Sequence, residues 1–264
     1  MKLATWKSML ISGAAAFCCV PAAQAGWVTV SNSGTPVLST CNPKPYTFPT
    51  PSTCLLTGNS LLAALGTGII LKVSASSPIV VAGVTVGTLY DRVYCYGIGT
   101  TCSTVGVNAN TYILAARVHL NTNPWNGHNL DAFEVDDIIR RIRNGVSADS
   151  AYWVGPDTGG STTTANPDLA LSSYSWLQYT GKTQYGVWDP LVGTRDNNYI
   201  DHRYWTNAGD PDGISSEWSG WVLAKQVCVS GLQSGQANFT IKLWAGGEEP
   251  EDHYTQWMPG YRCA

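Results

Sequence analysis

The fold of this chain is decided by two stretches, Val86–Tyr96 (VGTLYDRVYCY) and Thr111–Leu120 (TYILAARVHL). Both are rich in Val, Leu, Ile and Tyr, residue types that pack well on a pleated sheet. Within the first stretch, the side chains of Leu89–Tyr96 alternate between two faces with the period of a strand. Cys95 and Cys102 flank the turn that follows the first stretch. The two stretches therefore predict a pair of strands around which the rest of the fold is organised.

One charged side chain falls on the more apolar side of the first strand. Leu89, Asp91 and Val93 point to the same face because successive strand side chains alternate. A buried carboxylate is costly unless it is paired. We therefore expect a structural ion pair between Asp91 and Arg117 of the second strand.

Further short strands are expected on both sides of this pair. Segments with strand composition are 26–30, 67–73, 79–86, 151–154, 174–179, 187–188, 198–205, 218–229 and 239–244. Prolines exclude helix and central strand at 42–53, and a single helical turn is predicted at Leu61–Leu65. Many short strands separated by turns are typical of a mainly β fold, either a β-sandwich or a jelly roll.

One amphipathic helix is predicted over residues 131–143 (DAFEVDDIIRRIR). Asp131 followed by Glu134 fits a capping box. Acidic residues fill the first turns and arginines the last, which complements the helix dipole. Asp136 and Arg140 have the i,i+4 spacing of a helix ion pair. On this interpretation the acids stabilise the helix and do not catalyse a reaction.

The first 25 residues are typical of a secretory signal peptide. Two lysines are followed by an apolar run at 9–20, and Ala23-Gln24-Ala25 precedes the expected cleavage site. We expect a secreted, periplasmic or cell-surface protein with a single β-rich domain over 26–264. The alternative is an uncleaved anchor, although the apolar run is short for a membrane span.

The charge balance excludes several classes of partner. Without the two lysines of the signal, 13 basic side chains face 18 acidic ones, a net charge of −5. A general nucleic-acid binder needs a basic surface that displaces counterions, so no nucleic-acid partner is expected. No later apolar run reaches membrane-spanning length, so no membrane span is expected in the mature chain.

The six cysteines that follow the signal predict disulfides, because export brings them into an oxidising compartment. Their spacing favours three local pairs: Cys41–Cys54, Cys95–Cys102 and Cys228–Cys263. Other pairings of six cysteines remain open from the sequence. A metal site is the rival interpretation, but no CxxC spacing occurs.

Aromatic residues are abundant in the second half of the chain. Ten of the eleven Trp residues follow the signal. Flat rings stack on sugars, while neighbouring polar side chains bind the hydroxyl groups. We predict a binding surface for a glycan or a cell-surface protein at Trp205, Trp218, Trp221, Asp201 and Arg203. The alternative is that the rings fill a β core and its rim.

A structural calcium site is a further candidate. Asp210-Pro-Asp212-Gly213, followed by Glu217, places oxygen ligands near a glycine turn. The spacing excludes an EF-hand, and a plain Asp-Pro-Asp-Gly turn is the alternative. The predicted ligands are Asp210, Asp212 and Glu217, and no other cofactor is expected.

The segments VGTLYDRVY (86–94), YILAARVHL (112–120) and FEVDDIIRR (133–141) resemble a recurring part of β-rich bacterial exported surface proteins of the PEP-CTERM-associated kind. The resemblance covers about a quarter of the chain. It implies an exported, β-rich surface protein and no catalytic residues. The chain ends in GYRCA and lacks the sorting tail of that kind.

Together these features favour an exported, disulfide-linked, non-catalytic protein with a structural or binding role. The main alternative is an extracellular carbohydrate-active hydrolase, which would use two carboxylates among Asp201, Asp210, Asp212 and Glu217. A fibre or coat subunit, which would pair through an exposed strand edge, is a third hypothesis.

Overall fold

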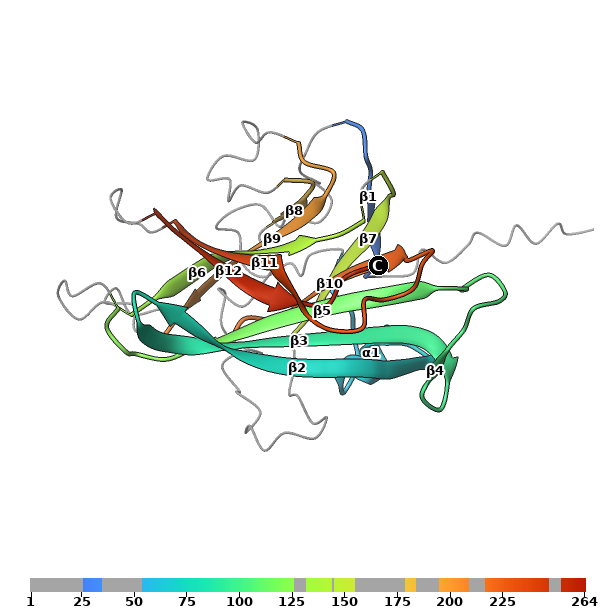
Figure 1. Ribbon diagram of the computed structural model, residues 1–264, viewed down its shortest axis with the longest axis horizontal. Helices are drawn as coiled ribbons and strands as arrows, with labels where there is room; N and C mark the ends of the chain where they lie inside the picture. The colour runs from blue at the N-terminus through green and yellow to red at the C-terminus, as the bar shows by residue number, and fades with distance from the viewer. Residues whose placement is uncertain are drawn as a thin grey trace, which may run out of the picture.

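The computed structural model describes residues 26–34, 54–125, 132–143, 145–154, 179–183, 195–208, 217–246 and 253–264. The predicted mainly β architecture is confirmed: two antiparallel sheets pack together as a sandwich (Figure 1). Among these residues the only helix is α1 (Leu61–Leu65), which confirms the predicted helical turn. Its first turn is capped by Ser60, whose hydroxyl accepts a hydrogen bond from Ala63 N at 3.2 Å.

The large sheet contains, in spatial order, β1 (Val28–Val30), β7 (Ala148–Trp153), β10 (Trp221–Val227), β5 (Thr111–Leu120), β3 (Val84–Ile98) and β2 (Ile69–Val81), with β4 (Thr101–Cys102) beside β3. The small sheet contains β12 (His253–Gly260), β11 (Ala237–Gly246), β6 (Glu134–Arg141), β9 (Tyr199–Asn207) and β8 (Tyr179–Gly181). The two predicted central strands, β3 and β5, are direct neighbours in the large sheet.

The main core lies between the sheets. Apolar side chains from both layers meet there, including Leu89 and Val118 of the large sheet and Ile138 and Leu243 of the small sheet. A second cluster lies on the outer face of the large sheet, where α1 packs on residues such as Trp221. Both faces of the large sheet are therefore partly covered.

The hairpin of β2 and β3 replaces three predicted strands with two long ones. The segment predicted as a strand over 79–86 contains the turn, because Ala82 and Gly83 both have positive φ, 48° and 84°. Two such residues form the tight turn whose twist suits a β-hairpin. The run is apolar on both sides of Gly83, so composition alone does not mark the turn.

The predicted helix over 131–143 is wrong, because residues 134–141 form strand β6 in the middle of the small sheet. Residues 135–140 are buried on both faces of the strand. The acids and arginines that suggested helix pairs instead bond to other strands: Asp137 pairs with Arg203 of the adjacent strand at 3.1 Å, and Arg140 pairs with Asp91 of the opposite sheet at 2.8 Å. Long-range pairing therefore overrides the local helix pattern.

The predicted pairing of Asp91 with Arg117 is also wrong. The register of β3 and β5 places Arg117 opposite Tyr90, on the outer face, while Asp91 points inward. Asp91 therefore meets Arg140, which reaches it from the other sheet. The prediction that Asp91 lies on the buried face and needs a partner is confirmed.

Two predicted disulfides are confirmed, Cys95–Cys102 and Cys228–Cys263. Cys54 is also disulfide-bonded, and its predicted partner Cys41 lies outside the described residues. Two disulfides indicate an oxidising, extracytoplasmic environment.

Some predictions fall on parts of the chain that the structure does not describe. These are the signal peptide at 1–25, the proline segment at 42–53 and the strands at 174–178 and 187–188. Within the described ranges, helices are too short to cross a bilayer.

Candidate functional site

The ring of Trp218 lies at the outer face of the large sheet, between two side chains of β5. His119 stacks on the ring with centroids 3.8 Å apart and an interplanar angle of 10°. The guanidinium of Arg117 lies 4.2 Å from the centroid of the same ring. Two planar groups this close to one centroid would overlap on a single face, so they occupy opposite faces of Trp218. A sugar therefore has no free face of Trp218 on which to stack.

Of the other two rings predicted to bind a ligand, Trp221 is buried against protein side chains, and the side chain of Trp205 lies outside the described residues. Trp221 is buried in the cluster beneath α1, and Arg92 lies 4.6 Å from its ring centroid. Lys225 forms a third such contact, 4.4 Å from the ring of Trp27. Cations and rings thus alternate across the outer face and hold it together. Nothing is described for the side chain of Trp205.

Asp201 and Arg203 lie on the outer face of the small sheet. Their neighbour His202 points the other way and approaches Ser150 of the large sheet, with Nε2 3.0 Å from the hydroxyl oxygen. Burial raises the pKa of Asp201 well above its usual value, and the nearby carboxylate of Asp137 raises that pKa further. The side chain is fully buried. These surroundings favour the neutral form of Asp201, whereas Asp137 beside it forms the ion pair with Arg203.

Two of the acids proposed for a hydrolase do not converge. Asp201 lies on the outer face of the small sheet, whereas Glu217 lies beside His119, 3.7 Å from its Nε2, on the outer face of the large sheet. Two packed layers separate these carboxyl groups. Asp210 and Asp212 lie outside the described residues, which contain no group of three or more His, Cys, Asp or Glu side chains arranged to hold a metal ion. The calcium site therefore stays a prediction.

A different surface feature lies at the end of the large sheet, where β3, β5, β7 and β10 come together. It is a hollow of about 270 Å³, which we call the polar hollow. Its walls include Tyr96, Asn108, Thr111, Ser147, Lys225 and Gln226. One aromatic residue, two amide side chains and three residues with hydroxyl groups, Tyr96 among them, thus line a common space.

Two side chains of the polar hollow, those of Lys225 and Gln226, differ in how their polar atoms are paired. Lys225 pairs with Asp149, another wall residue, at 3.0 Å. Gln226 is buried, and its Oε1 accepts a hydrogen bond from Arg143 N at 2.8 Å. Its Nε2 is buried and has no hydrogen-bond partner within the part of the chain that the structure describes. An unsatisfied buried donor costs about 1–3 kcal/mol, so this amide would gain from an acceptor in the hollow.

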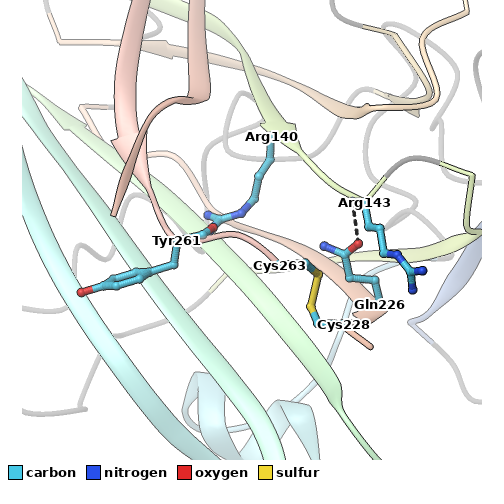
Figure 2. The surroundings of a disulfide bond; sticks show 6 residues. All are labelled: Arg140, Arg143, Gln226, Cys228, Tyr261 and Cys263. Atoms are coloured by element: carbon cyan, nitrogen blue, oxygen red, sulfur yellow. Dashed lines mark hydrogen bonds between the residues drawn. A yellow bond between two sulfur atoms is a disulfide. The ribbon is translucent and has the colours of Figure 1, made fainter. Parts of the chain in front are cut away.

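A second hollow of about 250 Å³ lies where β6 ends and the chain terminus passes. We call it the arginine hollow, and its walls include Arg141, Arg143, Asn198, Gln233, Arg262 and Cys263. Figure 2 shows Arg143 beside Gln226, next to the Cys228–Cys263 disulfide. The bonded pair of Arg143 and Gln226 forms a shared wall, because Gln226 belongs to the polar hollow and Arg143 to the arginine hollow.

Sequence reasoning missed both hollows. Arg141 and Arg143 were assigned to a helix end, where their charges had a local explanation. Once residues 134–141 are a strand, two arginines at its end without acidic neighbours are a signal of their own. Tyr96 and Gln226 carry no comparable signal, since each lies in a strand of ordinary composition.

The chain matches no family model, no curated protein and no solved structure in comparisons with known proteins.

Proposed function

We propose that this protein is an exported, non-catalytic binding protein that takes a sugar unit of a glycan in the polar hollow. The observation that carries the proposal is the polar lining of that hollow, which includes Gln226, whose buried Nε2 has no hydrogen-bond partner among the described residues. A hydroxyl oxygen of a sugar would accept the hydrogen bond that the protein does not supply.

The other walls suit the same ligand class. Tyr96 offers a ring with an apolar body and a polar hydroxyl group. Asn108, Thr111 and Ser147 supply donors and acceptors of the kind that fix hydroxyl groups. The volume of about 270 Å³ is near the lower end of the range for small-molecule sites, roughly 300 Å³, which favours one small unit of a longer chain.

The non-catalytic role is supported by the state of the acids in the described residues. Asp91, Asp137 and Asp149 each form an ion pair, and Asp201 is buried with a raised pKa. Glycoside cleavage by two carboxyl groups requires that both reach the substrate. The pair of Asp137 and Asp201 is fully buried and does not meet this requirement.

The test is a glycan array with the purified oxidised protein, followed by calorimetric titration of the best glycan. Gln226→Glu keeps an oxygen that accepts from Arg143 N but replaces the Nε2 donor, so we expect binding to weaken about 3–10-fold. Gln256→Glu makes the same chemical change on β12, away from the hollow, and should leave the affinity unchanged.

Two outcomes would contradict the proposal. One is equal affinity of the Gln226→Glu variant and the unaltered protein for every glycan that binds. The other is turnover: hydrolysis of a glycan that disappears in Asp201→Asn would favour a carbohydrate-active enzyme that uses Asp137 and Asp201.

A further inference from the structure

The arginine hollow concentrates positive charge in an acidic protein. Three guanidinium groups, those of Arg141, Arg143 and Arg262, line a space of about 250 Å³, whereas the whole chain has a formal charge of −3. Arginine stays protonated at all physiological pH values. Like charges gathered in a hollow repel one another, so the arrangement is favourable only when an anion compensates it.

Among the described residues, no side-chain carboxylate pairs with an arginine of this hollow. Ala264, the last residue of the sequence, also lines the hollow, and its carboxylate would offset one of the three positive charges. The ion pairs of the described residues join Asp91, Asp136, Asp137 and Asp149 to other cations and Glu217 to His119. The carboxylate of Asp196, two residues before Asn198, accepts hydrogen bonds from Asn198 N and Nδ2 at 2.9 Å. The three arginines that line the hollow therefore carry more positive charge than the described residues around them compensate.

The wall that carries Arg262 is held rigidly. The Cys228–Cys263 disulfide ties the residue after Arg262 to the end of β10 (Figure 2). Arg262 O accepts from Gln233 N at 3.0 Å, and Arg262 Nε donates to Gln233 Oε1 at 3.1 Å. This bond fixes the orientation of the guanidinium and leaves its two terminal nitrogens for another acceptor.

The same wall is anchored in the core of the sandwich. Arg140 donates to Tyr261 O at 2.7 Å, and Asp91 accepts from Tyr261 N at 2.6 Å. On the opposite wall, Ile142 N donates to Asn198 O at 2.7 Å, and Arg143 is held by its bond to Gln226. The backbone of both walls is therefore ordered before a ligand binds, and the entropic cost of binding falls on the side chains of Arg141 and Arg143.

We infer that the arginine hollow binds one oxyanion, a carboxylate, sulfate or phosphate group carried by an acidic glycan. The guanidinium fork matches the oxygens of all three groups and forms paired, charge-assisted hydrogen bonds with them. The amides of Asn198 and Gln233 add neutral polar contacts of the kind that sugar hydroxyl groups accept. The small volume and the negative net charge of the chain disfavour an extended polyanion such as nucleic acid.

The first experiment measures binding of inorganic sulfate and phosphate by calorimetry and by arginine side-chain NMR signals, at constant ionic strength in chloride. This experiment tests the arginine hollow alone. Its result can therefore be interpreted even if the polar hollow proves not to bind a sugar. Arg141→Gln is the main variant, because the Arg141 side chain has no hydrogen bond to another described residue, and we expect at least about ten-fold weaker binding. Arg262→Gln should have a similar effect.

Lys72→Gln is the matched control. Lys72 is exposed on β2, and its removal changes the net charge by the same amount. We expect the affinity of the Lys72→Gln variant for sulfate to stay within about two-fold of that of the unaltered protein. Equal loss in Lys72→Gln and Arg141→Gln would show a general charge effect and overturn the inference.

The second experiment compares an oligouronate, a sulfated oligosaccharide, a phosphorylated oligosaccharide and a neutral oligosaccharide. We expect at least one acidic glycan to bind more tightly than inorganic sulfate and to lose this advantage in Arg141→Gln. The preferred acidic glycan identifies the oxyanion. Equal binding of the neutral oligosaccharide, or tighter binding of a single-stranded oligonucleotide that Arg141→Gln weakens equally, would overturn the assignment to an acidic glycan.

Discussion

Replacement of Arg140 by methionine is the most informative test of how this sandwich is held together. Arg140 is fully buried, and Nη1 lies 2.8 Å from Oδ1 of Asp91, whose side chain is 2% exposed. Arg140 also donates to the carbonyls of Ala115 and Tyr261, at 3.3 and 2.7 Å. One side chain of the small sheet thus binds β5, β3 and the segment after β12.

Arg140→Met leaves the carboxylate of Asp91 buried without its cation. Breaking a buried ion pair by removal of one partner costs about 3–5 kcal/mol, because the remaining charge stays desolvated. Asp91 keeps one hydrogen bond, from Tyr261 N at 2.6 Å, which places the expected loss at the lower end of that range. The double variant Asp91→Leu with Arg140→Met buries no charge, so we expect it to recover most of the lost stability.

The assay is guanidinium chloride unfolding of the oxidised protein, monitored by tryptophan fluorescence. Lys225→Met is the control, because it breaks the pair of Lys225 with Asp149, which has a similar distance of 3.0 Å but side chains that are 18% and 31% exposed. We expect that control to cost less than about 1 kcal/mol. Equal losses in the two single variants, or a double variant as unstable as Arg140→Met, would refute the argument.

Two further predictions concern buried titratable groups. Burial lowers the pKa of His202 from 6.5 to about 3, so the folded state stays neutral while the unfolded state gains a proton below pH 6.5. Stability should therefore fall as pH drops from 6.5 towards 3, by at most about 1.4 kcal/mol per pH unit, and His202→Gln should flatten the profile of unfolding free energy against pH. The pKa of Asp201 is raised, so its contribution has the opposite sign: the folded state retains a proton that the unfolded state releases as pH rises above 3.8. Asp201→Asn should therefore become more stable relative to the unaltered protein as pH rises above 3.8 in the same titration, and parallel profiles would contradict this.

The sequence was sufficient for features that depend on near neighbours. Alternation in Leu89–Tyr96 identified a strand and placed Asp91 on its buried face, because the period of a strand is independent of what packs on it. The disulfides Cys95–Cys102 and Cys228–Cys263 were predicted from the even number of cysteines and from the short sequence separation within each pair. The helical turn at Leu61–Leu65 is likewise a local feature.

The tertiary structure decided the conformation of residues 134–141. Their charges fit a helix with internal ion pairs, yet Asp137 bonds to Arg203 of the adjacent strand and Arg140 to Asp91 of the opposite sheet. Local helix preference is worth only tenths of a kcal/mol per residue. An unpaired buried charge costs several kcal/mol, so the partners supplied by distant segments determine the outcome.

Both hollows likewise arise only when distant segments meet. The walls of the polar hollow include Tyr96 of β3 and Gln226 of β10, and those of the arginine hollow include Arg141 of β6 and Arg262 after β12. The chain by itself determined a β-rich, disulfide-linked architecture, because strand period and cysteine spacing are properties of neighbouring residues. Only the packed sandwich decided which charges are paired in the core and which are gathered around an open space, because charge pairing depends on distances between residues far apart in sequence.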